Sequence, residues 1–462
     1  MTFQRDLAWQ TIELSYRSSI AHQLARYALA MNYSLLPENV VHQAKRSLLE
    51  ALGCAIGAYE APGRAICEEM VKEIGGTPEA TVFCSGLRTS ALNASLVNGF
   101  LVRYLDAHDL GGGSHNEDAI ASILAVSEKE KSSGKDFLTS LVISYELGAR
   151  IREATSGAKD WPADMRTVLS SPPTLGKLMG LNEEQIANAI GISASHSLPL
   201  GILDDQREEY TMAKDTRFAF ATQHAIKSCM LAQRGFTGPL RVVEGHSGWR
   251  DILCKGNMDI ERLVDFSGWR ILKTRHKTLV TNGINHASVL GTIAICKEQD
   301  LKPEDIASVR IKVGVGEVNA RTVSAKKYPR NAESATHSIF YANAMAIKNR
   351  SLGAESIKPE NFTDPVVLDL IERITVETDS SIGHFQGASE ITTKDGRKFE
   401  KLVGVPHGFR DDPLTDKELD EKFSTLASPY IDEKQIRKIF DTVWNAEKLD
   451  DISKLTALMI VR

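Results

Sequence analysis

Apolar residues recur at helical spacing through most of the first 265 residues of the chain. In the stretch that begins at position 40, apolar side chains stand at Val41, Ala44, Leu48, Leu52 and Ile56. These steps of three and four residues place all five side chains on one face of a helix. The pattern therefore predicts a long amphipathic helix near the start of the chain.

Further along, the segments 120–126 and 137–151 repeat this spacing, and Gly134 with its neighbouring serines marks a break between them. Asn182, followed three residues later by Gln185, is typical of a capped helix start. Alanine, glycine and serine are frequent in these segments, and such small residues let helices approach one another closely. The first part of the chain is therefore predicted to be a buried helical bundle.

The pattern changes near Trp269. Valine and isoleucine alternate with other residues in 309–315, which indicates a strand, and 374–379 is a second strand candidate. Asp395 and Gly396 stand between two extended stretches, which is a strong hairpin signal. Helical stretches interrupt these strands at 337–348 and from Pro365 onward.

Helical spacing returns from Thr415 to the end of the chain. We therefore predict a mainly α fold with an α+β second domain. The large helical domain is built from both chain ends, residues 1–268 and 411–462, and the smaller α+β lid comprises residues 269–410.

Composition narrows the function classes. The chain has 462 residues and a net charge of −5, which gives no indication of nucleic-acid binding. Six cysteines are scattered without a Cys-x-x-Cys pair, which favours a reduced cytoplasmic protein over a disulfide scaffold or an iron–sulfur protein. No signal-peptide pattern and no run of eighteen apolar residues occurs, so we expect no membrane span.

The most suggestive local segment is the loop from Asp106 to His115, which also contains His108, Asp109 and the glycines 111–113. Glycines allow the backbone to approach a ligand, and the helical pattern that follows places His115 near a helix N-terminus, which suits carboxylates. The same residues are also typical metal ligands, although they lack the i, i+4 spacing of a helical zinc pair. A polar loop with an aspartate helix cap is the simplest structural alternative.

A cationic strip between Arg270 and His286 contains no acidic residue. In an acidic protein such a strip is a candidate anion-binding site, although solvated strand edges carry similar charges. Its basic residues are Arg270, Lys273, Arg275, His276, Lys277 and His286.

Two isolated residues complete the candidate set. Lys214, flanked by acidic residues and Arg217, could neutralise a substrate carboxylate or act as a base, or it could simply be exposed. Tyr341 lies among apolar residues on a predicted helix, where a buried tyrosine with a satisfied hydroxyl is the usual explanation. No dinucleotide-binding, P-loop or Gly-x-Ser-x-Gly motif is present.

The order of these features along roughly residues 15–455 resembles the MmgE/PrpD family. The resemblance rests on the Leu-Asp-x-x-Asp loop at 105–109 that ends in His115, and on motifs that follow it in family order. These motifs are YELGARI, GKLMGL, the Lys214 segment with RGFTGP, LKTRHKT with its following Asn-His, and THSIFYANAMAIKNR.

That resemblance implies a homodimer with a helical domain, an α+β lid and a metal-free, cofactor-free active site in the cleft between them. The family includes 2-methylcitrate dehydratase, cis-aconitate decarboxylase and iminodisuccinate epimerase, so the resemblance implies a small carboxylic acid as the substrate. The residues that match the cleft are Asp106, His115, Lys214, His286 and Tyr341, with Asp109 as the second acid of the loop and Lys273 at the start of the cationic lid strand.

One segment departs from the family pattern. Decarboxylase-like members carry a Gly-x-His-x-Thr segment, and dehydratase-like members an Asp-His pair, where this chain has AKDWPADMRTV with Trp161. The loop also ends in His115-Asn116-Glu117 where relatives have His-Pro-Ser. Both differences favour an altered substrate or reaction.

We predict acid/base catalysis in which cations stabilise negative charge that builds up beside a carboxylate. His115 and His286 would transfer protons, and Asp106 and Asp109 would orient them. The predicted reaction is hydration or dehydration of a citrate-like tricarboxylic acid. Epimerisation of a small dicarboxylate, decarboxylation of cis-aconitate and a non-catalytic metabolite-binding role are the alternatives. Lys214, Lys273, Arg275 and Lys277 would bind carboxylates, and Tyr341 would donate a hydrogen bond.

Overall fold

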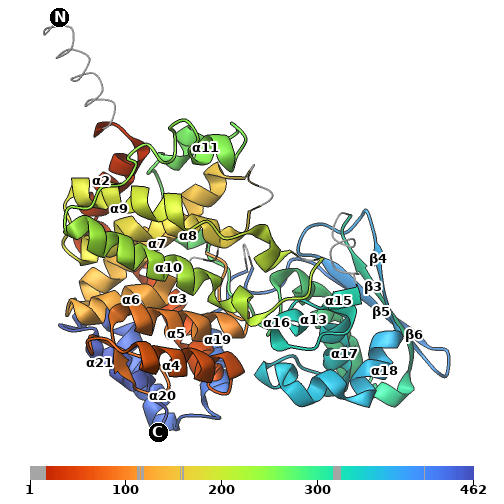
Figure 1. The fold of residues 1–462 in the computed structure, drawn as a ribbon. Helices are drawn as coiled ribbons and strands as arrows, with labels where there is room; N and C mark the ends of the chain where they lie inside the picture. Colours follow the sequence, from red (N-terminus) through yellow and green to blue (C-terminus); the bar gives the residue numbers. More distant parts are fainter. Residues whose placement is uncertain are drawn as a thin grey trace, which may run out of the picture.

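The computed structural model describes residues 17–111, 115, 119–156, 158, 161–205, 207–315, 324–409 and 412–462. Figure 1 shows a large helical body beside a smaller part that carries a four-stranded sheet. The predicted fold class is therefore confirmed in outline, as a mainly helical chain with a small mixed sheet in its C-terminal region.

Eleven helices from the first part of the chain are described in the helical body (Figure 1). They are α2 (Ile20–Ala30), α3 (Glu38–Gly57), α4 (Pro62–Ile74), α5 (Ala91–Tyr104), α6 (Ile120–Lys129), α7 (Gly134–Ala154), α8 (Thr167–Leu178), α9 (Glu183–His196), α10 (Met212–Gln233), α11 (Trp249–Ile252) and α12 (Ile260–Leu263). A short antiparallel pair, β1 (Ala80–Thr81) and β2 (Arg88–Thr89), accompanies them.

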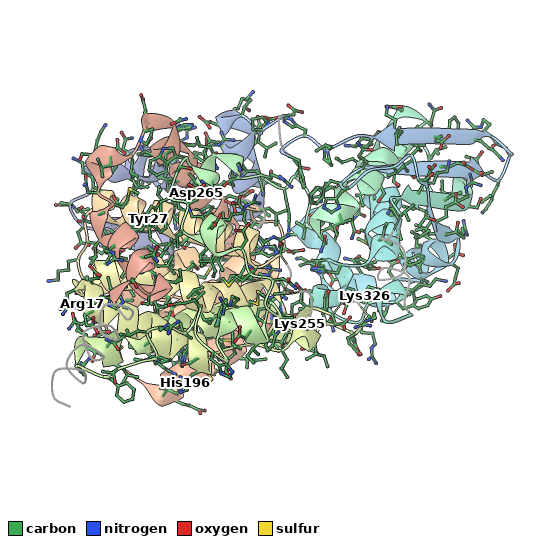
Figure 2. The ribbon with its side chains drawn as sticks, turned by 90° about the horizontal axis from the view of Figure 1, so that it is seen from above. Arg17, Tyr27, His196, Lys255, Asp265 and Lys326 are labelled. Atoms are coloured by element: carbon green, nitrogen blue, oxygen red, sulfur yellow. The ribbon has the colours of Figure 1, made fainter. Side chains whose placement is uncertain are left out.

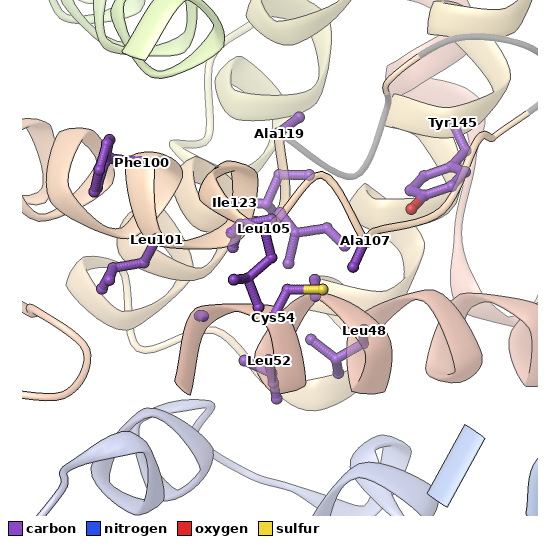
Figure 3. Packing of buried hydrophobic residues seen from close by; sticks show 14 of the residues in the cluster. Leu48, Leu52, Cys54, Phe100, Leu101, Leu105, Ala107, Ala119, Ile123 and Tyr145 are labelled. Carbon is purple, nitrogen blue, oxygen red and sulfur yellow. The ribbon is translucent and has the colours of Figure 1, made fainter. Parts of the chain in front are cut away.

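The predicted helix signals correspond to these elements. Helix α3 buries the apolar face read from the sequence, and Leu48, Leu52 and Cys54 pack beneath Leu105 and Ile123 (Figure 3). Burial of this much apolar side-chain surface is the main stabilising contribution to such a body.

Helix α9 begins with the predicted cap. The Asn182 side chain accepts from the Gln185 backbone N–H, and the Gln185 side chain accepts from the Asn182 N–H. This reciprocal pair satisfies two backbone donors at the helix start.

Both ends of the chain contribute to the helical body. Helices α19 (Asp416–Ala427) and α20 (Glu433–Trp444) pack against α3, and α21 (Ser453–Thr456) contacts α6. The limits 1–268, 269–410 and 411–462 remain a prediction, and residues 410 and 411 lie outside the described part. No helix of the described residues is both long and apolar enough to cross a membrane.

The smaller part is a mixed sheet with helices on one side. Its strand order is β4-β3-β5-β6, in which β4 pairs parallel to β3 and the other neighbours are antiparallel. The strands are β3 (Ile306–Val313), β4 (Ile374–Thr378), β5 (Gly387–Thr393) and β6 (Lys398–Val403), and the helices are α13 (His286–Glu298), α15 (Ser324–Lys327), α16 (Ala332–Ala335), α17 (Ile339–Asn349) and α18 (Pro365–Glu372).

The predicted hairpin joins β5 to β6, and Gly396 there has a φ of +88°. Helices α13 and α17 contact the sheet, and their buried faces form its core with the inner residues of β3 and β5. One local prediction was wrong: Lys273 does not begin a strand. Residues Arg270–Lys273 form a 3₁₀ turn, and Arg275 makes only an isolated bridge with Leu110.

Gly134, the first residue of α7, packs closely against Ala446 in the C-terminal segment. A methyl group added there would lie 1.7 Å from the Ala446 carbonyl oxygen, so the backbone would have to move. We expect Gly134→Ala to lower the free energy of unfolding by about 2 kcal/mol or more, as overpacking against rigid neighbours does. Urea unfolding followed by circular dichroism measures this change.

Gly404→Ala is the matched control, because a methyl group at Gly404 meets no atom within 4 Å. It should change the free energy of unfolding by less than about 0.5 kcal/mol. Equal stability of both variants would contradict the described packing of Ala446 on α7.

Candidate active site

A cavity of about 680 Å³ lies where the helical body meets the smaller part. Its walls come from both, with Arg103 and Asp106 from the helical body and His337 and Phe385 from the smaller part. Such a cavity is large enough for a small acid. Further lining residues are Leu110, His115, Arg152, Glu153, Ser156, Asp204, Arg262, Arg275, Asn282, Gly283, Ile284, His384 and Phe385.

Asp106 is the anionic centre of this cavity. Its Oδ1 lies 3.0 Å from Lys277 Nζ and 3.5 Å from an Arg103 nitrogen, and its Oδ2 lies 3.5 Å from His337 Nε2. Lys277 also donates to the Asp106 backbone carbonyl at 2.6 Å. The carboxylate therefore lies against two cations, Lys277 and Arg103, and against the His337 ring of the smaller part.

The backbone at Asp106 is strained, with a φ of +47°. This left-handed conformation is uncommon for a residue with a side chain, and it is retained where the surroundings over-determine it, often at functional sites. Burial alone would raise the pKa of Asp106, but Lys277, His337 and Arg103 lower it well below the usual range. Asp106 is thus a permanent anion at neutral pH.

Arg103 fixes the state of two histidines. One of its terminal nitrogens lies 2.9 Å from His108 Nε2 and 3.1 Å from His115 Nδ1. Because arginine can only donate, both of these ring nitrogens accept. We therefore assign the proton of neutral His115 to Nε2. Burial, followed by Arg103 and His108, lowers the pKa of His115 well below its usual value.

His337 is held in the opposite tautomer. Its Nδ1 lies 2.9 Å from Thr336 Oγ1 and 3.2 Å from the Glu333 carbonyl oxygen. Because the Thr336 hydroxyl donates its own proton to that carbonyl, both oxygens accept at Nδ1, so we assign the proton to Nδ1 and leave Nε2 unprotonated. Its ring stands edge-on to Tyr210 with 4.9 Å between centroids. Burial and Lys214 lower the pKa of His337 well below its usual value. The cavity therefore contains one imidazole that donates at Nε2 and one that accepts there.

Two more cations line the cavity as the sequence predicted. Arg275 is anchored by backbone hydrogen bonds with Leu110, at 2.8 and 3.3 Å, and its guanidinium lies 5.4 Å from the Phe385 ring centroid. Lys277 is fully buried against Asp106. Both belong to the predicted cationic strip.

Lys214 lies just behind the cavity wall. Its amine is buried, 3.7 Å from Asp215 Oδ1 and 5.2 Å from the Tyr210 ring centroid. Burial and Arg103 lower the pKa of Lys214, while burial and Glu333 raise the pKa of Asp215 to about 7.

The remaining predicted residues do not line the cavity. Lys273 is exposed at its rim, where its amine lies 3.8 Å from Glu153. His286 lies beneath it with both ring nitrogens bonded to the backbone, Nε2 accepting from Leu279 N–H and Nδ1 donating to the Asn282 carbonyl, each at 3.2 Å. Tyr341 is buried in the smaller part and donates to the Ser356 carbonyl at 2.5 Å.

Asp109 belongs to a second, buried cluster beneath the loop. It accepts from Tyr145 at 2.8 Å, and burial together with Glu50 raises its pKa. Glu50, Asp109 and His276 lie close enough to hold a metal ion. Lys422, however, already contacts Glu50 and donates to the Ala107 and Lys277 carbonyls at 2.6 and 2.7 Å. A lysine ammonium therefore supplies the positive charge of this cluster.

Sequence reasoning missed several cavity residues, chiefly His337, Tyr210 and Arg103. Each stands inside or beside a motif that was singled out for another residue, His337 four positions before Tyr341 and Tyr210 four before Lys214. Trp161 packs against the core and is not among the described lining residues.

Comparison with known proteins gives a consistent match over most of the chain. Residues 22–261 match the MmgE/PrpD N-terminal domain and residues 281–446 the MmgE/PrpD C-terminal domain. A cis-aconitate decarboxylase-like protein of Aspergillus oryzae is 25% identical, over 96% of this chain and 97% of its own length. Human cis-aconitate decarboxylase is 22% identical over 96% and 94%. The 2-methylcitrate dehydratase of Escherichia coli is 24% identical over 49% and 50%.

The buried cluster beneath the loop yields a stability prediction. Burial alone would raise the pKa of Glu50, but Lys422 and His276 lower it, so Glu50 stabilises the fold above the pKa it has in the unfolded chain. Lys422→Met should leave this buried carboxylate poorly compensated and lower the free energy of unfolding by about 3–5 kcal/mol at pH 8. Urea unfolding at pH 8 and pH 5 measures the difference.

In the variant the folded pKa of Glu50 rises above the unfolded value, so protonation relieves the destabilisation as the pH falls. The difference in the free energy of unfolding between the variant and the unsubstituted protein should therefore be smaller at pH 5 than at pH 8. Lys417→Met on the same helix is the control, since Lys417 is exposed and should change stability little. A difference in the free energy of unfolding that does not change with pH would contradict the inference that Lys422 compensates an ionised Glu50.

Proposed function

Because the chain belongs to the MmgE/PrpD family, we propose that it is a lyase that adds or removes water at a citrate-like tricarboxylic acid in the described cavity. The observation that carries this proposal is the pair of neutral histidines with opposite tautomers, His115 and His337, on either side of the Asp106 ion network. Removing water needs one group that takes a proton from carbon and another that donates to the departing oxygen.

His337 is the proposed base. Its free Nε2 would accept the proton from the carbon next to a substrate carboxylate, and the ring would become positively charged. Asp106 Oδ2, 3.5 Å from that nitrogen, would stabilise the new charge. The Nδ1 hydrogen bond to Glu333 holds the ring in position meanwhile.

His115 is the proposed donor. As the C–O bond at the adjacent carbon breaks, the departing hydroxide would take the Nε2 proton and leave as water, and Arg103 at Nδ1 would stabilise the imidazolate that remains. An imidazole kept neutral by its surroundings can serve as such an electrophile. The proton that His337 took from carbon would then return to His115 through solvent, which restores both rings. The products would be an alkene acid and water, and hydration would run through the same steps in reverse.

Cations would hold the substrate and stabilise the intermediate. Arg103, Arg275 and Lys277 line the cavity. The negative charge that develops on a carboxylate next to the deprotonated carbon would fall among these groups, where low solvent access strengthens each interaction. Asp106 would keep Lys277 in place.

Decarboxylation of a cis-aconitate-like acid is the second candidate. The decarboxylase relatives match over 96% of this chain, whereas the E. coli dehydratase matches over 49%. Loss of carbon dioxide needs charge stabilisation and a proton donor but no base for a C–H proton. The presence of a free base at His337 is what favours dehydration over this alternative.

We predict that His337→Gln reduces kcat by about 10²–10⁴-fold, the usual contribution of a general base. Because glutamine keeps a polar side chain at this buried position, the melting temperature should stay within a few degrees of that of the unsubstituted protein. His246→Gln is the control, since His246 is exposed on the helical body and should leave kcat unchanged.

The assay is a panel of carboxylic acids incubated in deuterated water and followed by NMR. Alkene formation from a citrate-like acid supports the proposal, and loss of a carboxyl carbon supports the second candidate. Proton exchange or inversion without net conversion would indicate an epimerase, and ligand-induced thermal stabilisation without any reaction would indicate a binder. Full activity in His337→Gln would remove His337 from the mechanism.

The assigned tautomers of His115 and His337 predict how the protonation of both rings depends on pH. Because the pKa values of His115 and His337 are both lowered by burial and nearby cations, both rings should stay neutral from pH 8 down to pH 6. An unperturbed histidine would be about three-quarters protonated at pH 6. Nitrogen-15 NMR of histidine-labelled protein, assigned with His115→Gln and His337→Gln, should show Nε2–H for the first ring and Nδ1–H for the second. Titration of either ring near pH 6.5 would contradict the assignment.

A further inference from the structure

Lys326 is a buried amine with no hydrogen-bond acceptor. Its side chain is 1% exposed, and its Nζ has no partner within the described part of the chain. Its Nζ lies over the face of Tyr210, 3.0 Å from the ring centroid. A buried ammonium without an acceptor is costly, so this position is incompletely satisfied in the empty protein.

Lys326 lies behind the Tyr210 side of the cavity, which we call its inner end, and neither Lys326 nor Lys214 is among the described lining residues. Tyr210 lines the cavity, and Lys214 lies 5.2 Å from the same ring centroid. His337, the proposed base, stands edge-on to this ring. Two amines and the base therefore surround a single aromatic side chain.

Lys326 and Tyr210 come from different parts of the fold, yet they are firmly connected. Tyr210 N–H donates to Ser334 Oγ at 3.0 Å, and Asn331 donates to the Tyr210 carbonyl at 2.9 Å. Figure 2 labels Lys326 in the smaller part of the molecule. These contacts hold the start of helix α16 against Tyr210, and helix α15, which carries Lys326, packs against α16 and α17.

We propose that Lys326 is a substrate-binding residue that takes one carboxylate of the tricarboxylic acid at the inner end of the cavity, beside Lys214. In the empty protein its amine rests on the Tyr210 ring. When substrate binds, the flexible Lys326 side chain moves its amine from the Tyr210 ring to a substrate carboxylate. On the ring the buried amine has no hydrogen-bond acceptor, and a carboxylate would supply one in a charge-assisted hydrogen bond, so the exchange is favourable. The inference rests on the proposed function, since it names how that substrate is recognised.

The charge state of Lys326 supports this role. Burial, followed by Lys214, lowers its pKa to about 7, so it is largely neutral at pH 8 in the empty protein. A bound carboxylate would restore the ammonium, and binding at pH 8 would therefore take up close to one proton at this residue. The other charged or titratable groups that face it are Lys214, Asp204, Asp205, Glu209 and Tyr210.

The experiment measures binding without turnover, by isothermal titration calorimetry with propane-1,2,3-tricarboxylate at pH 8 in buffers of different ionisation enthalpy. We expect Lys326→Met to weaken binding by about 10-fold to 100-fold, the effect of losing a hydrogen bond between charged groups. The variant should also take up about one proton fewer than the unsubstituted protein. Lys326→Arg should retain most of the affinity.

Lys327→Met is the matched control on the same helix. Lys327 pairs with Glu372 at 3.1 Å on the outer surface, and its removal should change affinity less than twofold. Equal affinity and equal proton uptake in Lys326→Met and the unsubstituted protein would overturn the inference and leave the proposed function standing, with Lys326 only packing on Tyr210. An unsubstituted protein that binds no tricarboxylate would overturn both.

Discussion

The site depends on one buried carboxylate that must be neutralised from two directions. Asp106 has a strained backbone and almost no exposure to solvent, so its charge is tolerated only because the cations of Lys277 and Arg103 lie against it. Arg103 belongs to the helical body, and His337, which lies against the same carboxylate, belongs to the smaller part. The ion network therefore fixes the relative position of the cavity walls, and the two histidines take their places from the same contacts.

That constraint also explains why neutral histidines occur in an anion-binding cavity. Arg103 occupies the acceptor nitrogens of His108 and His115, and a second positive charge on either ring would meet its guanidinium. Lys214 has the same effect on His337. The cations that we propose to bind a carboxylate substrate are thus the groups that keep both rings uncharged, so in the proposed mechanism substrate binding and the protonation state of the histidines have one physical cause.

Sequence reasoning reached the fold and about half of the site. Periodicity and capping predicted the helices and the hairpin, because these signals are local. Charged residues that stand close together in the sequence also identified two segments of the candidate site. These are the loop with Asp106 and His115 and the strip with Arg275 and Lys277. His337 could not be found this way, since only folding brings it to Asp106. His286 was misleading for the opposite reason: its partners are backbone atoms of its own turn, which no residue pattern displays.

The two ends of the cavity differ in a way that bears on what it binds. Around Asp106 every charge has an opposite charge within about 4 Å, so this end is complete without a ligand. Around Tyr210 the amines of Lys214 and Lys326 have lowered pKa values, because burial and mutual repulsion exceed the attraction of the nearby acids. A region that lacks negative charge when empty gains most from an anion. The inner end is therefore where a third carboxylate would add affinity, whereas Asp106 and its partners would position the reacting carbon.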